Sequence, residues 1–186
     1  MKIGFDLDKV FVNYPPIIPN FIIDKLYKEK DNGELKYKIP GTIEQKIRNL
    51  SHMPILRPLI KENVNFLKKI SKNPNYELYL ITSRFSFLKK RTDEIAQRIG
   101  FDKIFKKTYT NINNQQPHIF KEGIIKKEKI EIYFDDDLST LKFIAKKNPN
   151  IILFWLTNDE KKNVPNNIYK IKTLDDFLNH KIIFPK

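Results

Sequence analysis

Two carboxylates, Asp6 and Asp8, stand one residue apart at the end of an apolar N-terminal run. Residues two apart in an extended strand point to the same side, so both side chains should face one pocket. Neighbouring carboxylates repel each other unless a cation or a shared proton relieves the repulsion. The pair therefore indicates a metal site, although an Asp-x-Asp sequence after a strand is also common in a solvent-exposed turn.

A second group of polar residues follows another apolar run. Thr82, Ser83 and Arg84 come directly after residues 77–81, in the sequence LYLITSR, and a helix is expected next. Two hydroxyls and a guanidinium at such a turn are suited to holding an oxyanion. Either hydroxyl can instead cap the helix that follows.

A second acidic group, Asp135, Asp136 and Asp137, ends the run IEIYF. Three adjacent carboxylates can stabilise the N-terminus of a following helix through its dipole. Oxygen ligands alone are also what Mg²⁺ prefers, and here they lie at a second strand end. Lys121 precedes this group, in the sequence HIFKEG. The carboxylates predict a magnesium site, whereas a lysine in this chain is most often simply solvated.

The elements that would position these residues alternate along the chain. Strand patterns occur at residues 3–7, 77–81, 103–107, 130–134, 151–156 and, more weakly, 168–171. Helical patterns occur at residues 59–71, 87–99, 120–127, 138–146 and 174–179, and Gly100 should cap the second of these in a left-handed conformation. The alternation predicts an α/β fold, a Rossmann-like three-layer α/β/α sandwich with a mostly parallel sheet.

One long segment interrupts this alternation. Residues 13–56 contain five of the prolines and two amphipathic stretches, at residues 21–28 and 42–50. A connection of this length exceeds what one crossover helix needs, so we expect a small helical cap inserted after the first strand. The core domain would then comprise residues 1–12 and 57–186. Because the insert begins just after Asp8, it should form a lid over the carboxylates.

Composition limits the class of protein. The 186 residues are 40% hydrophobic, which is enough for one good core, and they include no cysteine, so disulfides and thiolate zinc sites are excluded. We expect no signal peptide and no membrane segment, and therefore a cytoplasmic protein without a membrane partner. The net charge of +13 permits a nucleic-acid partner, but the lysines are spread along helices, as on solvated faces. An acidic small substrate would be attracted by the same charge.

The order of these motifs resembles that of the haloacid dehalogenase superfamily of phosphohydrolases, over roughly residues 1–160. Asp6-Leu7-Asp8 is similar to the first motif of the superfamily, Thr82 to the second, and Asp135-Asp136 to the fourth. Lys121 best matches the third motif, with Lys106, Lys107 and Lys126 as rivals. A receiver domain has similar ingredients, but its lysine comes last and it has no place for the long insert.

This resemblance implies a Mg²⁺-dependent phosphatase of small phosphate monoesters that works through an aspartyl-phosphate. Asp6 would be the nucleophile and Asp8 the general acid and base. Thr82, Ser83 and Lys121 would bind the phosphoryl group, and Asp6, the Asp8 carbonyl, Asp136 and Asp135 would hold the metal. The register within Asp135, Asp136 and Asp137 stays open.

Lys9 departs from the superfamily pattern, because glycine is common at this position, and Val10 follows as the usual small or β-branched residue. The departure leaves open a member that has lost turnover. The alternative function is accordingly a catalytically weak or inactive scaffold that binds nucleic acid. The two functions differ in whether an aryl phosphate is hydrolysed in the presence of Mg²⁺.

The substrate itself is not determined by these motifs. A short insert after the first motif resembles the arrangement in deoxyribonucleotide 5′-phosphatases of the 5′(3′)-deoxyribonucleotidase type. The aromatic residues Tyr14, Phe21 and Tyr27 could stack on a base, or they could form the core of the insert. The further candidates for contact with the phosphate or the leaving group are His52, Arg57 and His118.

Overall fold

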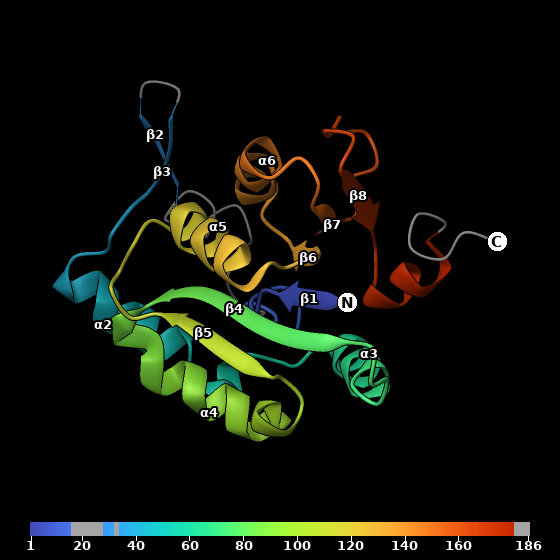
Figure 1. Ribbon diagram of the computed structural model, residues 1–186. Coiled ribbons are helices and arrows are strands. Elements are labelled where there is room, and N and C mark those ends of the chain that lie inside the picture. The colour runs from blue at the N-terminus through green and yellow to red at the C-terminus, as the bar shows by residue number, and fades with distance from the viewer. Residues whose placement is uncertain (16–27, 32–33, 181–186) are drawn as a thin grey trace.

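The computed structural model, which describes residues 1–15, 28–31 and 34–180, is built around a six-stranded parallel sheet (Figure 1). The strand order is β5-β4-β1-β6-β7-β8. The strands are β1 (Lys2–Phe5), β4 (Glu77–Phe85), β5 (Lys107–Asn111), β6 (Ile132–Asp135), β7 (Ile152–Leu156) and β8 (Ile168–Ile171). The chain thus runs to one side of β1 first and then to the other. In such sheets the connections diverge beside the first strand, and ligands bind at its carboxyl end.

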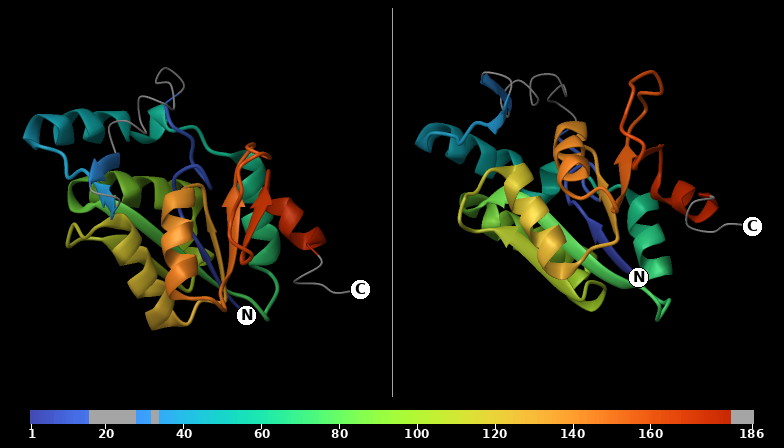
Figure 2. Two further views of the ribbon diagram at one scale, coloured as in Figure 1. Left: turned by 90° about the horizontal axis from the view of Figure 1, so that it is seen from above. Right: turned by 45° about the horizontal axis from the view of Figure 1, so that its top comes forward.

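Helices cover both faces of the sheet, as Figure 2 shows. Helices α3 (Lys61–Ile70) and α4 (Lys89–Ile99) pack on one face, while α5 (Pro117–Glu128) and α6 (Leu138–Lys147) pack on the other. Each face has its own cluster of buried apolar side chains, because a fully covered parallel strand must bury both its sides. The predicted three-layer α/β/α sandwich is therefore confirmed.

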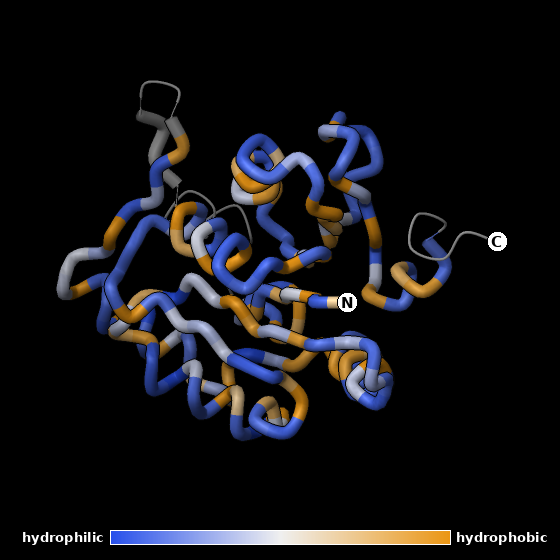
Figure 3. Tube along the Cα trace, in the orientation of Figure 1, coloured by the Kyte–Doolittle hydropathy of each residue, from blue (hydrophilic) through white to orange (hydrophobic). Residues whose placement is uncertain are grey.

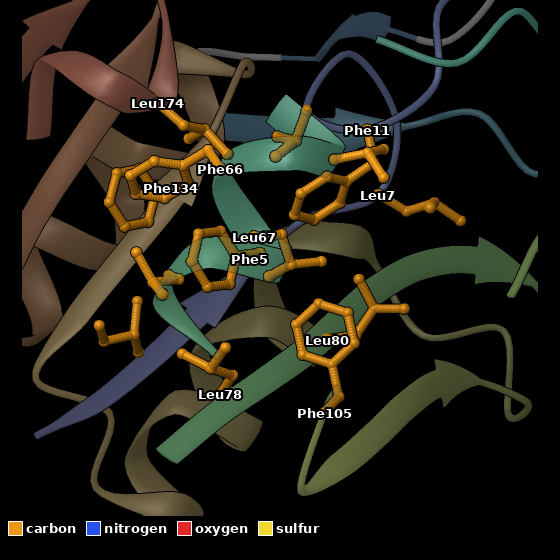
Figure 4. Packing of buried hydrophobic residues seen from close by; sticks show 14 of the residues in the cluster. Phe5, Leu7, Phe11, Phe66, Leu67, Leu78, Leu80, Phe105, Phe134 and Leu174 are labelled. Atoms are coloured by element: carbon orange, nitrogen blue, oxygen red, sulfur yellow. The ribbon is translucent and has the colours of Figure 1, made fainter. Parts of the chain in front are cut away.

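The core on the face of α3 and α4 is rich in aromatic rings (Figure 4). Phe5 stacks on Phe134 with ring centroids 4.8 Å apart, and Phe134 stacks on Phe154 at 4.9 Å, so one ladder of rings crosses three strands. Figure 3 shows hydrophobic residues along the inner strands and hydrophilic residues along much of the outer surface of the helices. This ladder packs β1, β6 and β7 against one another, and the ends of β1 and β6 carry the predicted carboxylates.

Two predicted elements differ from those observed. The strand expected at residues 103–107 begins at Lys107 instead, and Phe101–Lys103 forms a 3₁₀ turn. The apolar pattern there reflects core packing, since the buried rings of Phe101 and Phe105 meet at 4.9 Å. The segment Leu174–Asn179 is 3₁₀ rather than α-helical. Gly100 adopts φ 78° at the end of α4, as predicted for a left-handed cap.

The described part of the insert combines a hairpin with a helix. Strands β2 (Lys28–Asp31) and β3 (Glu34–Tyr37) pair antiparallel, and α2 (Thr42–Ser51) follows, matching the helix predicted at residues 42–50. The other predicted amphipathic stretch, residues 21–28, lies outside the described residues except for Lys28, which begins β2. The expected helical insert therefore contains a two-stranded hairpin as well.

The loop after β1 is held from two directions. Lys9 has φ 59°, in the left-handed region where glycine is favoured, and its N–H donates to the Val12 carbonyl at 2.7 Å. Glycine would adopt this conformation without the steric cost that a side chain brings. The amide of Asn63 on α3 donates to the Val10 carbonyl at 2.7 Å, and its oxygen accepts from the Leu174 N–H at 3.3 Å. One buried side chain thereby joins the loop to the C-terminal 3₁₀ turn.

Among the helices that the structure describes, none combines the length and the apolar character needed to cross a membrane.

Candidate active site

The carboxyl ends of β1, β4 and β6 open into one cavity of about 450 Å³. Its walls come from the core and from the insert, because Tyr37 and Arg48 line it together with the residues of the strand ends. The predicted site residues that line it are Asp6, Asp8, Ser83, Lys121, Asp135 and Asp136. Residues from four distant parts of the sequence therefore meet at one edge of the sheet.

Lys121 lies between two carboxylates at the base of the cavity. Its Nζ is 3.1 Å from Asp6 Oδ1 and 2.7 Å from Asp135 Oδ2, and all three side chains are buried. Burial would lower the pKa of Lys121, but the carboxylates of Asp135 and Asp6 raise it well above its usual value. Burial raises the pKa of Asp6 to about 7, with Lys121 opposing the shift. The lysine is thus held as a cation against Asp6.

Three carboxylates form a cluster suited to a divalent cation. Asp6, Asp135 and Asp136 each place an oxygen within 4.8 Å of the others, and across residues 1–15, 28–31 and 34–180 this is the one such group. Burial raises the pKa of Asp136, and Asp135 and Asp6 raise it further, since like charges gathered here repel. A donor set of carboxylate oxygens fits Mg²⁺. Asp136 is held in place through its carbonyl, which accepts from Trp155 Nε1 at 2.9 Å.

Asp137 has a structural task instead. Its Oδ1 accepts from the Ser139 N–H at 3.0 Å and so caps α6, and its Oδ2 accepts from the Tyr37 hydroxyl. Asp137 N–H also donates to Asp135 Oδ1 at 3.0 Å. The register that the sequence left open is therefore one in which Asp135 and Asp136 join the cluster and Asp137 caps the helix.

Asp8 faces away from this cluster, toward two arginines. Arg84 binds it in a bidentate pair, with Nε and Nη2 each 2.7 Å from a carboxylate oxygen, and Arg57 donates to Oδ1 as well. Burial would raise the pKa of Asp8, but Arg84 and Arg57 outweigh it and hold the pKa well below its usual range. Arg84, expected to hold an oxyanion of the substrate, instead holds an oxyanion of the protein. The Asp8 side chain is not part of the metal cluster, so only its carbonyl could serve the metal.

The two hydroxyls after β4 differ in position. Ser83 lines the cavity, whereas Thr82 is buried and is not among the lining residues. Thr82 Oγ1 accepts from the Arg84 N–H at 3.5 Å. Strand β4 continues through Phe85, so the helix that either hydroxyl was thought to cap begins only afterwards.

Tyr37 joins the insert to the core. The side-chain amide of Gln116 makes two hydrogen bonds to the backbone of Tyr37, accepting from its N–H at 2.8 Å and donating to its carbonyl at 3.1 Å. The Tyr37 hydroxyl reaches Asp137 and, at 2.9 Å, Thr140. Its ring lies 5.8 Å from that of His118, which in turn packs against Phe143 at 4.5 Å. His118 is therefore part of this aromatic contact rather than of the cavity wall.

The remaining candidates divide clearly. Tyr14 and His52 line the cavity, whereas Phe21 and Tyr27 lie outside the described residues. The rival lysines are elsewhere: Lys106 pairs with Glu77, Lys107 pairs with Glu128, and Lys126 is exposed on α5. Lys121 alone among these four lies against Asp6.

Tyr37, Arg48 and Trp155 line the cavity but carried no signal in the sequence. Tyr37 and Arg48 belong to the insert, where no motif marks them, and Trp155 lies within β7 among other apolar residues. The one available hint was the amphipathic pattern of residues 42–50, which places Arg48 on a defined side of its helix.

Comparisons with solved structures identify the fold. An archaeal β-phosphoglucomutase from a hyperthermophilic Pyrococcus strain is similar with a TM-score of 0.61 and 13% identity, over 98% of each chain. A haloacid dehalogenase-like hydrolase from Streptococcus pneumoniae is similar with a TM-score of 0.56 and 14% identity, over 96% of this chain and 97% of that one. A HAD family enzyme from Bacteroides thetaiotaomicron, solved with magnesium and inorganic phosphate, is similar with a TM-score of 0.55 and 13% identity, over 86% of this chain and 95% of that one.

No protein-family model matches the sequence, and no curated protein matches it significantly. At identities this low, structural similarity establishes the fold alone. The chain has the Rossmann-like α/β fold of haloacid dehalogenase-type hydrolases, and its activity has to be argued from the site.

Proposed function

We propose that this protein is a Mg²⁺-dependent phosphatase that hydrolyses a small phosphate monoester through an aspartyl-phosphate on Asp6. The observation that carries the proposal is the placement of Asp6, which contacts Lys121 at 3.1 Å and shares the carboxylate cluster with Asp135 and Asp136. A nucleophile, a fixed cation and a metal-binding cluster thus meet in one cavity, as the slow hydrolysis of phosphate esters requires.

The residues divide the work as follows. Asp6 attacks phosphorus, and the bond from phosphorus to the alcohol oxygen breaks. Lys121 offsets the charge of Asp6 and of the incoming phosphoryl group, and the Ser83 hydroxyl donates to a phosphoryl oxygen. Asp135 and Asp136, with Asp6, would hold Mg²⁺, which supplies positive charge to the phosphoryl oxygens when bound. Water then cleaves the aspartyl-phosphate and regenerates Asp6.

Asp8 is best placed for the second half of this cycle. As a carboxylate held by Arg84 and Arg57, it can accept a proton from the attacking water. The resemblance also implies that Asp8 protonates the departing alkoxide, but Arg84 and Arg57 keep its carboxyl group ionised and so oppose that step. Esters of acidic alcohols, such as aryl phosphates, need least help of that kind and are the natural first substrates.

The proposal is tested by phosphate release from an aryl phosphate with and without Mg²⁺. Asp6→Asn should abolish release while leaving the circular dichroism spectrum unchanged, because it removes the nucleophile and keeps the size of the side chain. Lys107→Met, which removes an exposed lysine that pairs with the largely buried Glu128 outside the cavity lining, is the control and should retain activity. Activity that survives in Asp6→Asn, or that needs no divalent cation, would refute the mechanism.

The nature of the ester is a separate question. Tyr14 lines the cavity and could stack on a base, which supports mononucleotides as one class to assay. A panel of nucleotides and sugar phosphates with Mg²⁺ would decide between them, and equal rates would remove the nucleotidase proposal. Salt-sensitive oligonucleotide binding without any turnover would favour the binding-module alternative instead.

A further inference from the structure

Strand β4 is irregular where it reaches the cavity. It advances three residues, from Thr82 to Phe85, while its neighbour β5 advances one. Two residues of β4, Ser83 and Arg84, are therefore extra in the pairing of these strands and form a β-bulge. Successive side chains of a regular strand point to opposite faces. Here the consecutive residues Ser83, Arg84 and Phe85 all line the cavity, as expected where a bulge redirects side chains.

The side chain of Asn111, the last residue of β5, contacts this bulge. A bulge disrupts the hydrogen bonds between two strands, so buried backbone groups there need other partners. The Nδ2 atom of Asn111 donates to the Ser83 carbonyl at 3.3 Å. Asn111 is 1% exposed, so water cannot readily take its place. The backbone of Ser83 is thus held by a buried side chain of the neighbouring strand.

The same amide is anchored at its other end by the turn before α5. Its Nδ2 also donates to the Gln115 carbonyl at 2.7 Å, and its Oδ1 accepts from the Gln115 N–H at 2.9 Å. Helix α5 begins two residues later, at Pro117, after the loop that leads back from β5 (Figure 1). Because both polar atoms of the amide form hydrogen bonds, the side chain of Asn111 is fixed in one orientation.

The hydroxyl of Ser83 is open to a ligand. Ser83 is half-buried, and among the described residues none makes a hydrogen bond to its hydroxyl. The hydroxyl of Thr82, by contrast, accepts from the Arg84 N–H and does not line the cavity. Lys121 is held separately, by Asp6 and Asp135. The contact with Asn111 therefore matters for the position of Ser83 rather than for that of the lysine.

We propose that Asn111 is a positioning residue for phosphate binding, which holds the bulge so that the Ser83 hydroxyl donates to a phosphoryl oxygen. This inference rests on the proposed phosphatase function and adds to it a residue that does not itself line the cavity. Without the amide, the Ser83 carbonyl and the backbone of Gln115 lose buried partners, which is costly. The bulge then rearranges to recover hydrogen bonds, and the hydroxyl leaves its place.

Phosphate release from an aryl phosphate with Mg²⁺ tests the inference. Asn111→Asp keeps the size of the side chain and the acceptor for Gln115 but removes the donor to the Ser83 carbonyl, and Asn111→Ala removes both without adding a charge. Each should lower kcat/KM about tenfold, as Ser83→Ala does, because each forfeits one charge-assisted hydrogen bond to the phosphoryl group. Asn114→Asp is the matched control. It makes the same change at an exposed position of the same loop, keeps the acceptor for the Ser86 N–H and should leave kcat/KM unchanged.

A double-mutant cycle separates positioning from general damage to the fold. In Ser83→Ala, the further change Asn111→Ala should alter kcat/KM by less than about threefold, because the hydroxyl that Asn111 positions is gone. Equal effects of Asn111→Ala with and without that hydroxyl would overturn the inference, and so would wild-type kcat/KM in either Asn111 variant. Circular dichroism shows whether the variants fold, and if Asn111→Ala does not, Asn111→Asp takes its place in the cycle.

Failure of this inference differs from failure of the proposed function. If no ester is hydrolysed, the proposed function falls, and the calorimetric affinity for inorganic phosphate with Mg²⁺ replaces kcat/KM in the same cycle. An affinity about tenfold weaker in Asn111→Ala, and no weaker again when Ser83→Ala is added, supports the positioning role. Independent losses from the two substitutions, or a wild type that binds no phosphate, overturn it.

Discussion

Replacement of Lys121 by methionine is the sharpest test of the arrangement at the base of the cavity. Methionine keeps the length and the apolar stem of the side chain but removes the charge that lies 2.7 Å from Asp135 and 3.1 Å from Asp6. Removing one partner of a buried ion pair costs about 3–5 kcal/mol, because the other charge stays buried and unpaired. Two carboxylates lose their partner here, so we expect the upper part of that range at about pH 8.

The penalty should depend on pH in a defined direction. Without Lys121, burial raises the pKa of Asp6 and Asp135 further above the value in the unfolded chain, so the folded protein binds more protons there. Each of these carboxyl groups contributes its full stabilisation at pH values below its pKa in the unfolded chain. As pH rises toward its pKa in the folded protein, that contribution to the free energy of unfolding is lost, by up to about 1.4 kcal/mol per pH unit for each group. The variant should therefore approach the wild type in stability as the solution is acidified toward about pH 5.

Magnesium should compensate for the missing lysine. A cation bound to Asp6, Asp135 and Asp136 stabilises the folded state by mass action, and with Lys121 absent it meets no competing charge. Urea unfolding can be followed by the fluorescence of Trp155, the one tryptophan of the chain, which is held against Asp136. Addition of about 10 mM MgCl₂ should raise the midpoint more in Lys121→Met than in the wild type. A metal-free variant within about 1 kcal/mol of the wild type at pH 8 would refute the reasoning.

Three further substitutions probe other parts of the structure. Tyr37→Phe removes the hydroxyl that Asp137 and Thr140 share and should cost about 1–3 kcal/mol in urea unfolding, with a loss under about 0.5 kcal/mol contradicting the anchor. Burial lowers the pKa of His52 to about 3, with Arg84 and Arg57 adding to the shift. As pH falls below about 6.5, the imidazole is therefore protonated in the unfolded chain but not in the folded one, and the free energy of unfolding of the wild type decreases. His52→Asn should reduce the dependence of the free energy of unfolding on pH between about pH 6.5 and 4, and the same dependence in variant and wild type would contradict the lowered pKa. Gly4→Ala would place a Cβ 2.8 Å from Tyr133 Cδ2 and should lower stability by about 1–3 kcal/mol, whereas an unchanged melting temperature would mean that the ring moves aside.

Much of the architecture follows from local patterns in the sequence. Runs such as residues 151–156 are apolar on both sides, which only a covered parallel strand requires, and the helices between them carry periodic apolar residues. Parallel strands then bring their carboxyl ends to one edge, which is why the sequence predicts Asp6 and Asp135 side by side. Lys121 lies on helix α5, and only the resemblance in motif order favoured it over the three rival lysines.

Features that leave no pattern in the side chains escaped prediction. Strands β2 and β3 have the sequences KEKD and ELKY, which show little of the β-branched and aromatic enrichment of strands. Their pairing is a matter of backbone hydrogen bonds rather than of side-chain pattern. Arg57 was a candidate for contact with the phosphate or the leaving group, but nothing in the sequence indicated its partner, Asp8, which lies 49 residues earlier in the chain.

The contact made by Asn63 also bears on the order in which the protein matures on the ribosome. Its amide spans the Val10 carbonyl and the Leu174 N–H, so the loop that carries Asp8 is fully braced only after almost the entire chain has been synthesised. The N-terminal strand emerges first, yet the contacts around the loop that follows it are complete only when the turn at Leu174 has formed. A nascent chain would therefore carry this loop before Asn63 has made both of its hydrogen bonds.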